Sequence, residues 1–156
     1  MAEIPGAHAR TRPRVLSGIQ PDHSLHIGNY LGALRNWVRD QDRYENYFCI
    51  VDLHALTQHP DPAKLRANTL ELAAVYVASG LDPSRCEIFV QSHVPAHSEL
   101  NWILECLTPM GWLDRMTQFK ARRQAQGSER IATGVYTYPV LQTADIVLYD
   151  ADFVPV

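Results

Sequence analysis

The stretch Tyr47-Phe-Cys-Ile-Val-Asp52 is a continuous apolar run that ends in polar residues. Such a run is typical of a strand that helices bury on both faces of a parallel sheet. Working outward along the chain, Val15–Ser17 and Glu87–Gln91 are shorter runs of the same kind, and we expect both to be strands. Between the runs, apolar residues recur at helical spacing. This alternation predicts an α/β fold in which crossover helices join parallel strands.

The first two crossover helices have recognisable limits. The break at Gly18–Pro21 precedes a helix whose apolar residues recur over 27–38. Asp61 and Pro62 combine an N-cap residue with a proline at the first helical position. We therefore expect a second helix to begin there and to end near Gly80.

The second half of the chain is expected to be mainly helical. A long helix over 98–120 must kink or split at Pro109 and Gly111. A further helix is expected over Pro139–Tyr149, followed by a last strand at Phe153–Val156. Three large apolar residues of the long helix are expected to pack in the interior: Trp102, Leu107 and Trp112.

The composition fits one globular domain. The chain has 156 residues, of which 46% are hydrophobic and 20% charged, and its formal net charge is −3. That charge supplies no general attraction for nucleic acid, so an RNA partner would need a local patch or other parts of a protein. Cys49, Cys86 and Cys106 are odd in number and form no CxxC pair, which favours free thiols and a reducing cytoplasm. Residues 1–13 have no apolar signal core, and we expect them to form a flexible leader.

A polar cluster follows the first expected strand, where ligands of open parallel sheets bind. Gly28 opens a helix there, and a helix start offers unpaired N–H groups and a positive dipole end to a phosphate. His26 can donate a hydrogen bond to a phosphate oxygen. Turn and cap chemistry explains the same two residues, so taken alone they leave a phosphate site as one of two interpretations.

Two pairs of residues that include histidine follow the next two strands. Asp52 and His54 are placed by strand alternation on one face, where both would reach a common ligand. The alternative is an aspartate that caps a turn and a histidine that is satisfied by backbone. His93 and His97 have a metal-like spacing, but Pro95 interrupts a regular helix between them and no third ligand is near. We expect both to be ordinary satisfied or exposed histidines, and no metal site.

A third cluster lies on the expected helix 139–149 and just before it. Tyr138 and Asp145 are seven residues apart, and Gln142 lies between them on the same helical face. A carboxylate on an otherwise apolar helix is costly to bury without a partner. Asp145 therefore either faces water or accepts a hydrogen bond from a donor such as an indole N–H.

Five motifs in order resemble the tryptophanyl-tRNA synthetase family, which belongs to the class I aminoacyl-tRNA synthetases. The resemblance spans about Val15 to Val156. The motifs are Ser-Gly-Ile-Gln-Pro (17–21) with His-Ile-Gly-Asn-Tyr (26–30), Cys-Ile-Val-Asp-Leu-His-Ala (49–55), Arg-Met-Thr-Gln-Phe-Lys (115–120), Thr-Tyr-Pro-Val-Leu-Gln-Thr-Ala-Asp-Ile-Val-Leu-Tyr (137–149) and Val-Pro-Val (154–156).

The resemblance implies a Rossmann-like doubly wound parallel sheet and a tryptophan–tRNA ligase activity. It implies an ATP site with Mg²⁺ held through the phosphates, and it assigns His26, Asn29 and Lys120 to catalysis. The residues implied for ATP are Gln20, Pro21, Asp22, His26, Gly28 and Asn29. Those implied around tryptophan are Leu16, Gly18, His54, Tyr138, Gln142, Asp145, Val154 and Val156, with Asp145 accepting the indole N–H. Arg122 and Arg123 resemble part of a mobile segment near the phosphates.

Implied partners are L-tryptophan, ATP and tRNA(Trp), in a cytoplasmic homodimer without a membrane anchor.

The sequence departs from the family pattern in three ways. Asp22-His23 stands where the family commonly has Ser-Gly, which places a carboxylate beside the expected phosphate site. Gln142 stands where many bacterial members have Met, so the pocket would be more polar, or Gln142 would pair with Tyr138. The chain ends at Val156, before the KMSKS loop and the helical tRNA-reading domain. We therefore expect 14–156 to be a catalytic domain that is truncated at its C-terminus.

Two other functions remain open at this point. A small stand-alone nucleotidylyltransferase also uses a Gly/His helix start, although it would not explain the motifs at 49–55 and 137–149. A non-catalytic fragment that binds tryptophan or ATP would have the same motifs without turnover. A related synthetase specific for tyrosine is the nearest alternative, and Asp145 is the residue that argues against it.

Overall fold

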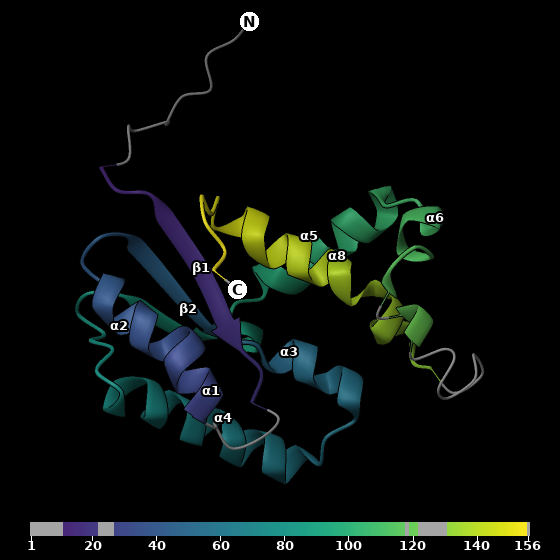
Figure 1. Ribbon diagram of the computed structural model, residues 1–156. Helices are drawn as coiled ribbons and strands as arrows, with labels where there is room; N and C mark the ends of the chain where they lie inside the picture. The colour runs from purple at the N-terminus through teal and green to yellow at the C-terminus, as the bar shows by residue number, and fades with distance from the viewer. Residues whose placement is uncertain (1–10, 22–26, 118, 122–130, 156) are drawn as a thin grey trace, which may run out of the picture.

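The computed structural model describes residues 11–21, 27–117, 119–121 and 131–155, in the arrangement shown in Figure 1. The predictions for residues 1–10, and those for Asp22, His26, Arg122–Arg123 and Val156, lie outside the described residues.

Within these ranges, three parallel strands form one sheet in the order β1-β2-β3. Their bounds are Arg14–Ile19 for β1, Glu45–Ile50 for β2 and Glu87–Val90 for β3. All three predicted strands are present, but β1 extends through Gly18 and Ile19, where a break was expected. β2 starts and ends two residues earlier than predicted, which removes Asp52 from the strand.

One face of the sheet is covered by the two crossover connections (Figure 1). The first consists of α1 (Ile27–Asn29), the π-helix η1 (Tyr30–Leu34) and α2 (Arg35–Asp40), and the second is α4 (Pro62–Ala78). Trp37 stacks on Phe48 with ring centroids 4.6 Å apart and forms a T-shaped pair with Tyr76 at a centroid distance of 5.5 Å. Phe48 and Tyr76 are fully buried, so this aromatic group forms the centre of the core on this face.

The limits predicted for α4 are confirmed. The Asp61 side chain accepts a hydrogen bond from the Lys64 backbone N–H at 3.0 Å, as an N-cap does, and Pro62 is the first helical residue. Beyond the helix, Gly80 has φ of 106°, a left-handed conformation that side chains rarely adopt. This turn directs the chain back toward β3.

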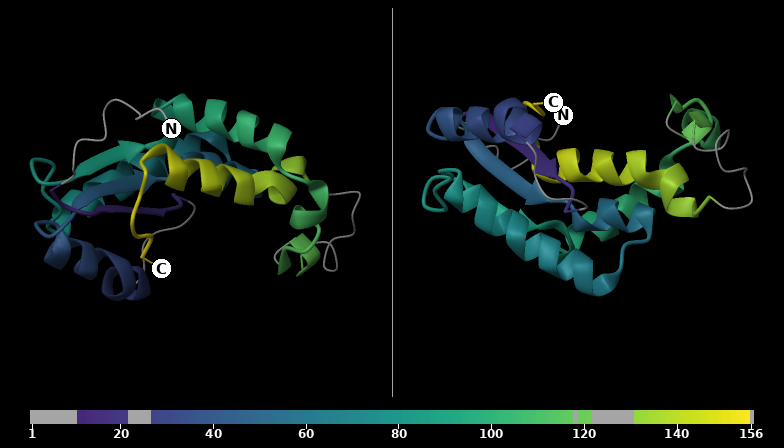
Figure 2. Two further views of the ribbon diagram at one scale, coloured as in Figure 1. Left: turned by 90° about the horizontal axis from the view of Figure 1, so that it is seen from above. Right: turned by 60° about the horizontal axis from the view of Figure 1, so that its bottom comes forward.

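The opposite face carries α5 (Ala96–Leu107) and α8 (Thr133–Leu148), which pack side by side across the strands (Figure 1, Figure 2). The ring of Tyr149 lies 5.0 Å from Tyr47 of β2 and 5.2 Å from Phe89 of β3, measured between centroids. Helices on both faces of a parallel sheet confirm the predicted doubly wound α/β class.

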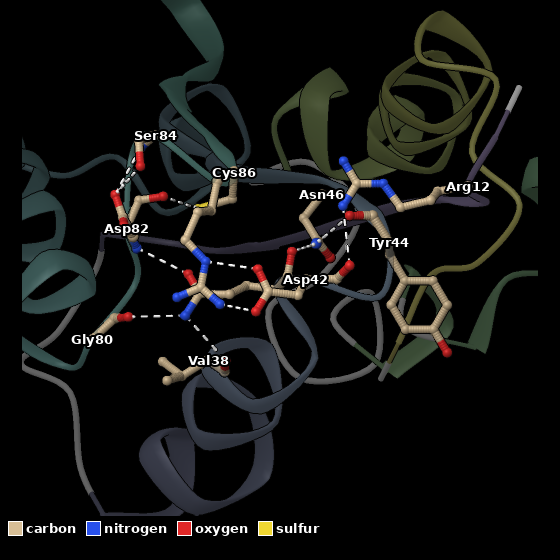
Figure 3. A network of polar contacts seen from close by, with 11 residues as sticks. Arg12, Val38, Asp42, Tyr44, Asn46, Gly80, Asp82, Ser84 and Cys86 are labelled. Carbon is tan, nitrogen blue, oxygen red and sulfur yellow. Dashed lines mark hydrogen bonds and ion pairs between the residues drawn. The ribbon is translucent and has the colours of Figure 1, made fainter.

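A polar network connects the turns that precede β2 and β3, at the end of the sheet where these two strands begin (Figure 3). Buried Gln41 donates to the carbonyls of Val38 and Gly80 and accepts from the N–H of Asp82 at 3.0 Å. Arg85 forms an ion pair with Asp42 in the same region. One buried amide thus fixes both crossovers, because it satisfies backbone groups from each of them.

The long helix predicted over 98–120 is split at Pro109, and α6 (Met110–Leu113) begins after it. The prediction that its large residues pack in the interior was wrong. Periodicity identifies an apolar helical stripe but does not say what covers it, and the described residues leave these three side chains exposed. The exposed fractions are 67% for Trp102, 73% for Leu107 and 63% for Trp112.

The last helix and strand also differ from the expectation. α8 starts at Thr133, so Pro139 lies inside the helix and not at its first turn. The predicted last strand is a single parallel bridge between Phe153 and Val15, in which the N–H of Leu16 donates to the carbonyl of Phe153 at 3.1 Å. Asp150, with φ of 50°, makes the turn that leads from α8 into this bridge.

Candidate functional site

A cavity of about 400 Å³ opens where the carboxyl ends of β1 and β2 face α8. Parallel sheets place their ligand sites at this edge, because the loops that leave the strands diverge there. The cavity contains eight residues that the sequence singled out, namely Leu16, Gly18, Gln20, His54, Tyr138, Gln142, Asp145 and Val154. Ser17, Cys49, Val51, Ile146 and Pro155 complete the lining.

Gly18 gives the cavity its depth beside β2. A Cβ atom built on Gly18 would lie 2.6 Å from the carbonyl oxygen of Cys49 and 3.0 Å from Cγ1 of Val51. Contacts this short do not occur between real Cβ and oxygen atoms, so any side chain here would push the two strands apart. The absence of a side chain therefore keeps β1 against β2 and leaves room above them.

Asp145 lies in the cavity wall and is held by three side chains from three other elements. His54 comes from α3 (Asp52–Ala55), and its Nε2 lies 2.8 Å from Oδ2 of Asp145. Gln91 comes from η3 (Gln91–His93), and its Nε2 donates to Oδ1 at 2.8 Å. The Nδ1 atom of His97, on α5, lies 2.7 Å from the same Oδ1.

These contacts decide the ionisation of Asp145. Burial alone raises the pKa of this carboxyl, but the hydrogen bonds from His54, His97 and Gln91 together outweigh burial and hold the pKa below its usual 3.8. A carboxylate has about four lone-pair positions. Among the described residues, two donors occupy Oδ1 and one occupies Oδ2, so Oδ2 keeps the capacity to accept one further N–H.

The alternative in which Asp145 faces water is wrong, because only 6% of this residue is exposed. Sequence periodicity placed Asp145 correctly on one helical face with Tyr138 and Gln142, but it did not reveal the donors that make burial possible. The prediction for His97 is confirmed, since both of its ring nitrogens have partners.

Of the two interpretations of Asp52 and His54, the one in which both reach a common ligand is wrong, and the one in which the aspartate caps a turn holds for Asp52. Both belong to the short helix α3, where the strand alternation used to place them does not apply. Asp52 is directed to η3 instead, where it accepts hydrogen bonds from the backbone N–H and the hydroxyl of Ser92. Only His54 takes part in the cavity.

Gln142 lies on the exposed part of the cavity wall. In the part of the chain that the structure describes, its side chain makes no hydrogen bond to Tyr138, contrary to one of the two expectations for this residue. The ring of Tyr138 instead forms a T-shaped pair with the ring of His54, with centroids 6.4 Å apart. Gln142 therefore leaves a polar group in the wall of the cavity.

The residues predicted for a nucleotide are only partly brought together. Gln20 lines the cavity, and its Oε1 accepts from Nε2 of Gln58 in η2 (Leu56–Gln58) at 3.3 Å. The carbonyl of Pro21 accepts from the Asn68 side chain at 3.1 Å. Gly28 and Asn29 form part of α1 and do not line the cavity.

Lys120 is also outside the cavity. It belongs to the segment that follows α6, which all views place at the far end of α8 from α1 (Figure 1, Figure 2).

Among the described residues, no three His, Cys, Asp or Glu side chains gather in a way that would hold a metal ion. Over the same ranges, the helices are too short or too polar to cross a bilayer.

Sequence reasoning missed the polar layer behind Asp145, which consists of Gln91 and Tyr149 together with His97. Gln91 appeared only as the last residue of a strand, and Tyr149 only as the end of a helix. The position of Gln91 in the sequence could have indicated its role, because it follows a buried parallel strand at the edge of the sheet where ligands bind.

Comparisons with known proteins agree with this arrangement. The sequence model of a family described as tRNA synthetases class I (W and Y) matches residues 8–156. The tryptophan–tRNA ligase of Thermosynechococcus vestitus is 61% identical over 142 residues, which are 91% of this chain and 43% of that protein. This chain thus spans less than half the length of that relative.

Solved structures show the same relationship. The tryptophanyl-tRNA synthetase of Campylobacter jejuni is 40% identical, with a TM-score of 0.88 over 94% of this chain and 45% of that one. A second structure of the Campylobacter jejuni enzyme, described as complexed with ADP and tryptophane, is 41% identical, with a TM-score of 0.85 over 92% of this chain and 44% of that one. From the family match and these identities, the chain belongs to the class I tRNA synthetases for tryptophan and tyrosine.

Proposed function

We propose that this chain carries the amino-acid activation site of a tryptophan–tRNA ligase. The observation that carries the proposal is Asp145, an ionised and anchored carboxylate that retains one acceptor position at Oδ2 in the cavity wall. The indole of tryptophan offers a single N–H on an otherwise apolar ring. A site built around such an acceptor rejects analogues that lack the donor much better than an apolar slot does.

The remaining cavity residues are proposed to hold the indole and the amino-acid backbone. Leu16 and Val154 supply apolar surface, and Gly18 leaves space beside β2. Tyr138, Gln142 and His54 supply polar groups to the cavity wall. The names of the relatives support tryptophan as the amino acid, and Val156 is proposed to join this set, as the family resemblance implies.

ATP is proposed to bind beside the cavity, where β1 leads toward α1. Gln20 supports this location because it lines the cavity at the end of β1. The start of the helical stretch at α1 brings backbone N–H groups near Gly28 and Asn29, and such groups attract phosphate. The ATP site would consist of Gln20, Pro21, Asp22, His26, Gly28 and Asn29. ADP in the relative from Campylobacter jejuni is consistent with this nucleotide.

Mg²⁺ is proposed to arrive with the ATP phosphates and to neutralise part of their charge. In the activation step, the tryptophan carboxylate attacks the α-phosphorus, the bond to pyrophosphate breaks, and tryptophanyl-adenylate forms. The 3′-terminal ribose hydroxyl of tRNA(Trp) then displaces AMP. The chain's own contribution is to position the two reactants and to stabilise phosphate charge through His26 and Asn29. Lys120, which lies outside the cavity, would join them only after its segment moves toward the phosphates.

The chain is further proposed to act in the cytoplasm as a homodimer. Its three cysteines are free, which suits a reducing compartment. The dimer would use the apolar stripe of α5 and α6, where large side chains are exposed without a cover from the described residues. These side chains are Trp102, Ile103, Leu107, Met110 and Trp112.

Tryptophan-dependent exchange of pyrophosphate into ATP tests the proposal. The parent chain should catalyse exchange with tryptophan and not with tyrosine, and Asp145→Ala should abolish it. If the folded parent binds tryptophan but supports no exchange, the chain is a binding module. If it binds neither tryptophan nor ATP, the proposed site is wrong.

A further inference from the structure

Behind Asp145 lies a second layer of side chains that does not touch the cavity. His97 is fully buried, with Nδ1 2.7 Å from Oδ1 of Asp145 and Nε2 2.9 Å from the hydroxyl of Tyr149. Neither His97 nor Tyr149 lines the cavity. The two residues therefore form a chain of hydrogen bonds that ends on the carboxylate from the side opposite to a ligand.

The partners of His97 determine which ring nitrogen carries the proton when the ring is neutral. An ionised carboxylate only accepts hydrogen bonds, so Nδ1 must be the donor toward Asp145. Nε2 is then an acceptor, and the Tyr149 hydroxyl donates to it. Each polar atom in this series of hydrogen bonds is therefore either a donor or an acceptor, and its neighbour is the opposite.

Tyr149 is itself held on several sides. Its ring centroid lies 5.0 Å from Tyr47, 5.2 Å from Phe89 and 5.5 Å from His97. Its carbonyl accepts from Nη1 of Arg14 at 3.0 Å, which ties the end of α8 to β1. Little rotational freedom remains for this ring, so its hydroxyl is a fixed point from which His97 is oriented.

We propose that His97 and Tyr149 are positioning residues for amino-acid selection. With Gln91, His97 fills the acceptor positions of Oδ1, so the carboxylate cannot rotate and its one open position on Oδ2 is directed at the indole N–H. This inference rests on the proposed function, because it explains how the same site distinguishes an N–H donor. It assigns part of the specificity to residues that never touch tryptophan.

The test compares two ligands of nearly equal shape, L-tryptophan and L-3-benzothienylalanine, in which sulfur replaces the indole N–H. Binding of each is measured by calorimetry on the parent chain and on Tyr149→Phe, His97→Phe and His97→Asn. Tyr47→Phe is the matched control, because it removes a hydroxyl from the same aromatic group, but that hydroxyl donates to Glu45 and not toward Asp145. Circular dichroism establishes that each variant is folded.

Tyr149→Phe and His97→Phe should lower the preference for tryptophan over the thiophene analogue by about tenfold, through weaker binding of tryptophan alone. His97→Asn should retain more of the preference, because the asparagine amide can replace the Nδ1 donor. Tyr47→Phe should leave the preference unchanged.

If folded Tyr149→Phe and His97→Phe keep the parent preference, or lose affinity for both ligands equally, the positioning role is wrong while the tryptophan site stands. If the parent itself shows no preference for tryptophan, the proposed function fails as well.

Discussion

Nε2 of His54 lies 2.8 Å from Oδ2 of Asp145, although the two residues are 91 positions apart in the chain. The contact joins the short helix α3 after β2 to the last turn of α8. Because both side chains are nearly enclosed, the pair fixes the distance between these two walls of the cavity.

The Asp145 carboxylate should stabilise the fold in a pH-dependent way. Its pKa in the folded chain lies below the usual 3.8, so its contribution is fully present above pH 3.8 and is lost as the pH falls through the folded value. Asp145→Asn should therefore cost about 2 kcal/mol of unfolding free energy at pH 7, and the difference from the parent should shrink below pH 3.8. Urea unfolding at a series of pH values measures both curves. If the difference in unfolding free energy between the parent and Asp145→Asn does not change with pH, the pKa of Asp145 is not lowered in the folded chain.

Replacing Gly18 by alanine should disturb the cavity and the sheet together. The new Cβ would meet the Cys49 carbonyl at 2.6 Å, and we expect a loss of roughly 1–3 kcal/mol of stability. Gly32→Ala is the control, because a Cβ there meets nothing within 4 Å and lies on a helical segment, where alanine is favourable. Thermal unfolding of both variants gives the comparison. Equal effects would mean that the close approach of the strands is not what requires glycine at position 18.

The three thiols should differ in reactivity. Cys49 is buried, and burial, followed by the nearby Asp145 and Asp52 charges, raises its pKa far above its ordinary value of 9.0. Burial also raises the pKa of Cys86, whereas Cys106 is exposed. We expect one fast thiol with an alkylating reagent at pH 8 when the chain is monomeric, because the proposed dimer contact on α5 would cover Cys106, and this thiol disappears in Cys106→Ser. Fast modification of Cys49, mapped by mass spectrometry, would show that the cavity wall opens readily.

The sequence predicts the repeated strand and helix units well, because continuous apolar runs and caps are local signals. Asp61 and Gly80 mark the two ends of α4 with signals that are local in the sequence. The position of Asp145 on its helix was also predictable from spacing.

Its environment was not predictable, because Gln91, His97 and Tyr149 are brought to it by packing between elements that are distant in sequence. The exposure of Trp102 was missed for the same reason: an apolar stripe looks alike whether α8 or another molecule covers it.

The apolar stripe on α5 and α6 should mediate self-association. Trp102→Glu with Leu107→Glu would place charges in the centre of the proposed dimer contact, and the sedimentation coefficient should fall from that of a dimer to that of a monomer. Leu70→Glu is the matched control, since Leu70 is equally exposed but lies on α4. A dimer that survives the double substitution, or is lost in Leu70→Glu, would place the contact elsewhere.

The central claim is that Asp145 recognises tryptophan, and calorimetric titration of the chain with L-tryptophan tests it most directly. The parent should bind tryptophan and not tyrosine, and Asp145→Asn should weaken binding by at least about tenfold. Asp52→Asn should bind as the parent does, because Asp52 contacts Ser92 outside the cavity. Equal tryptophan affinity in the parent and in Asp145→Asn would contradict the claim.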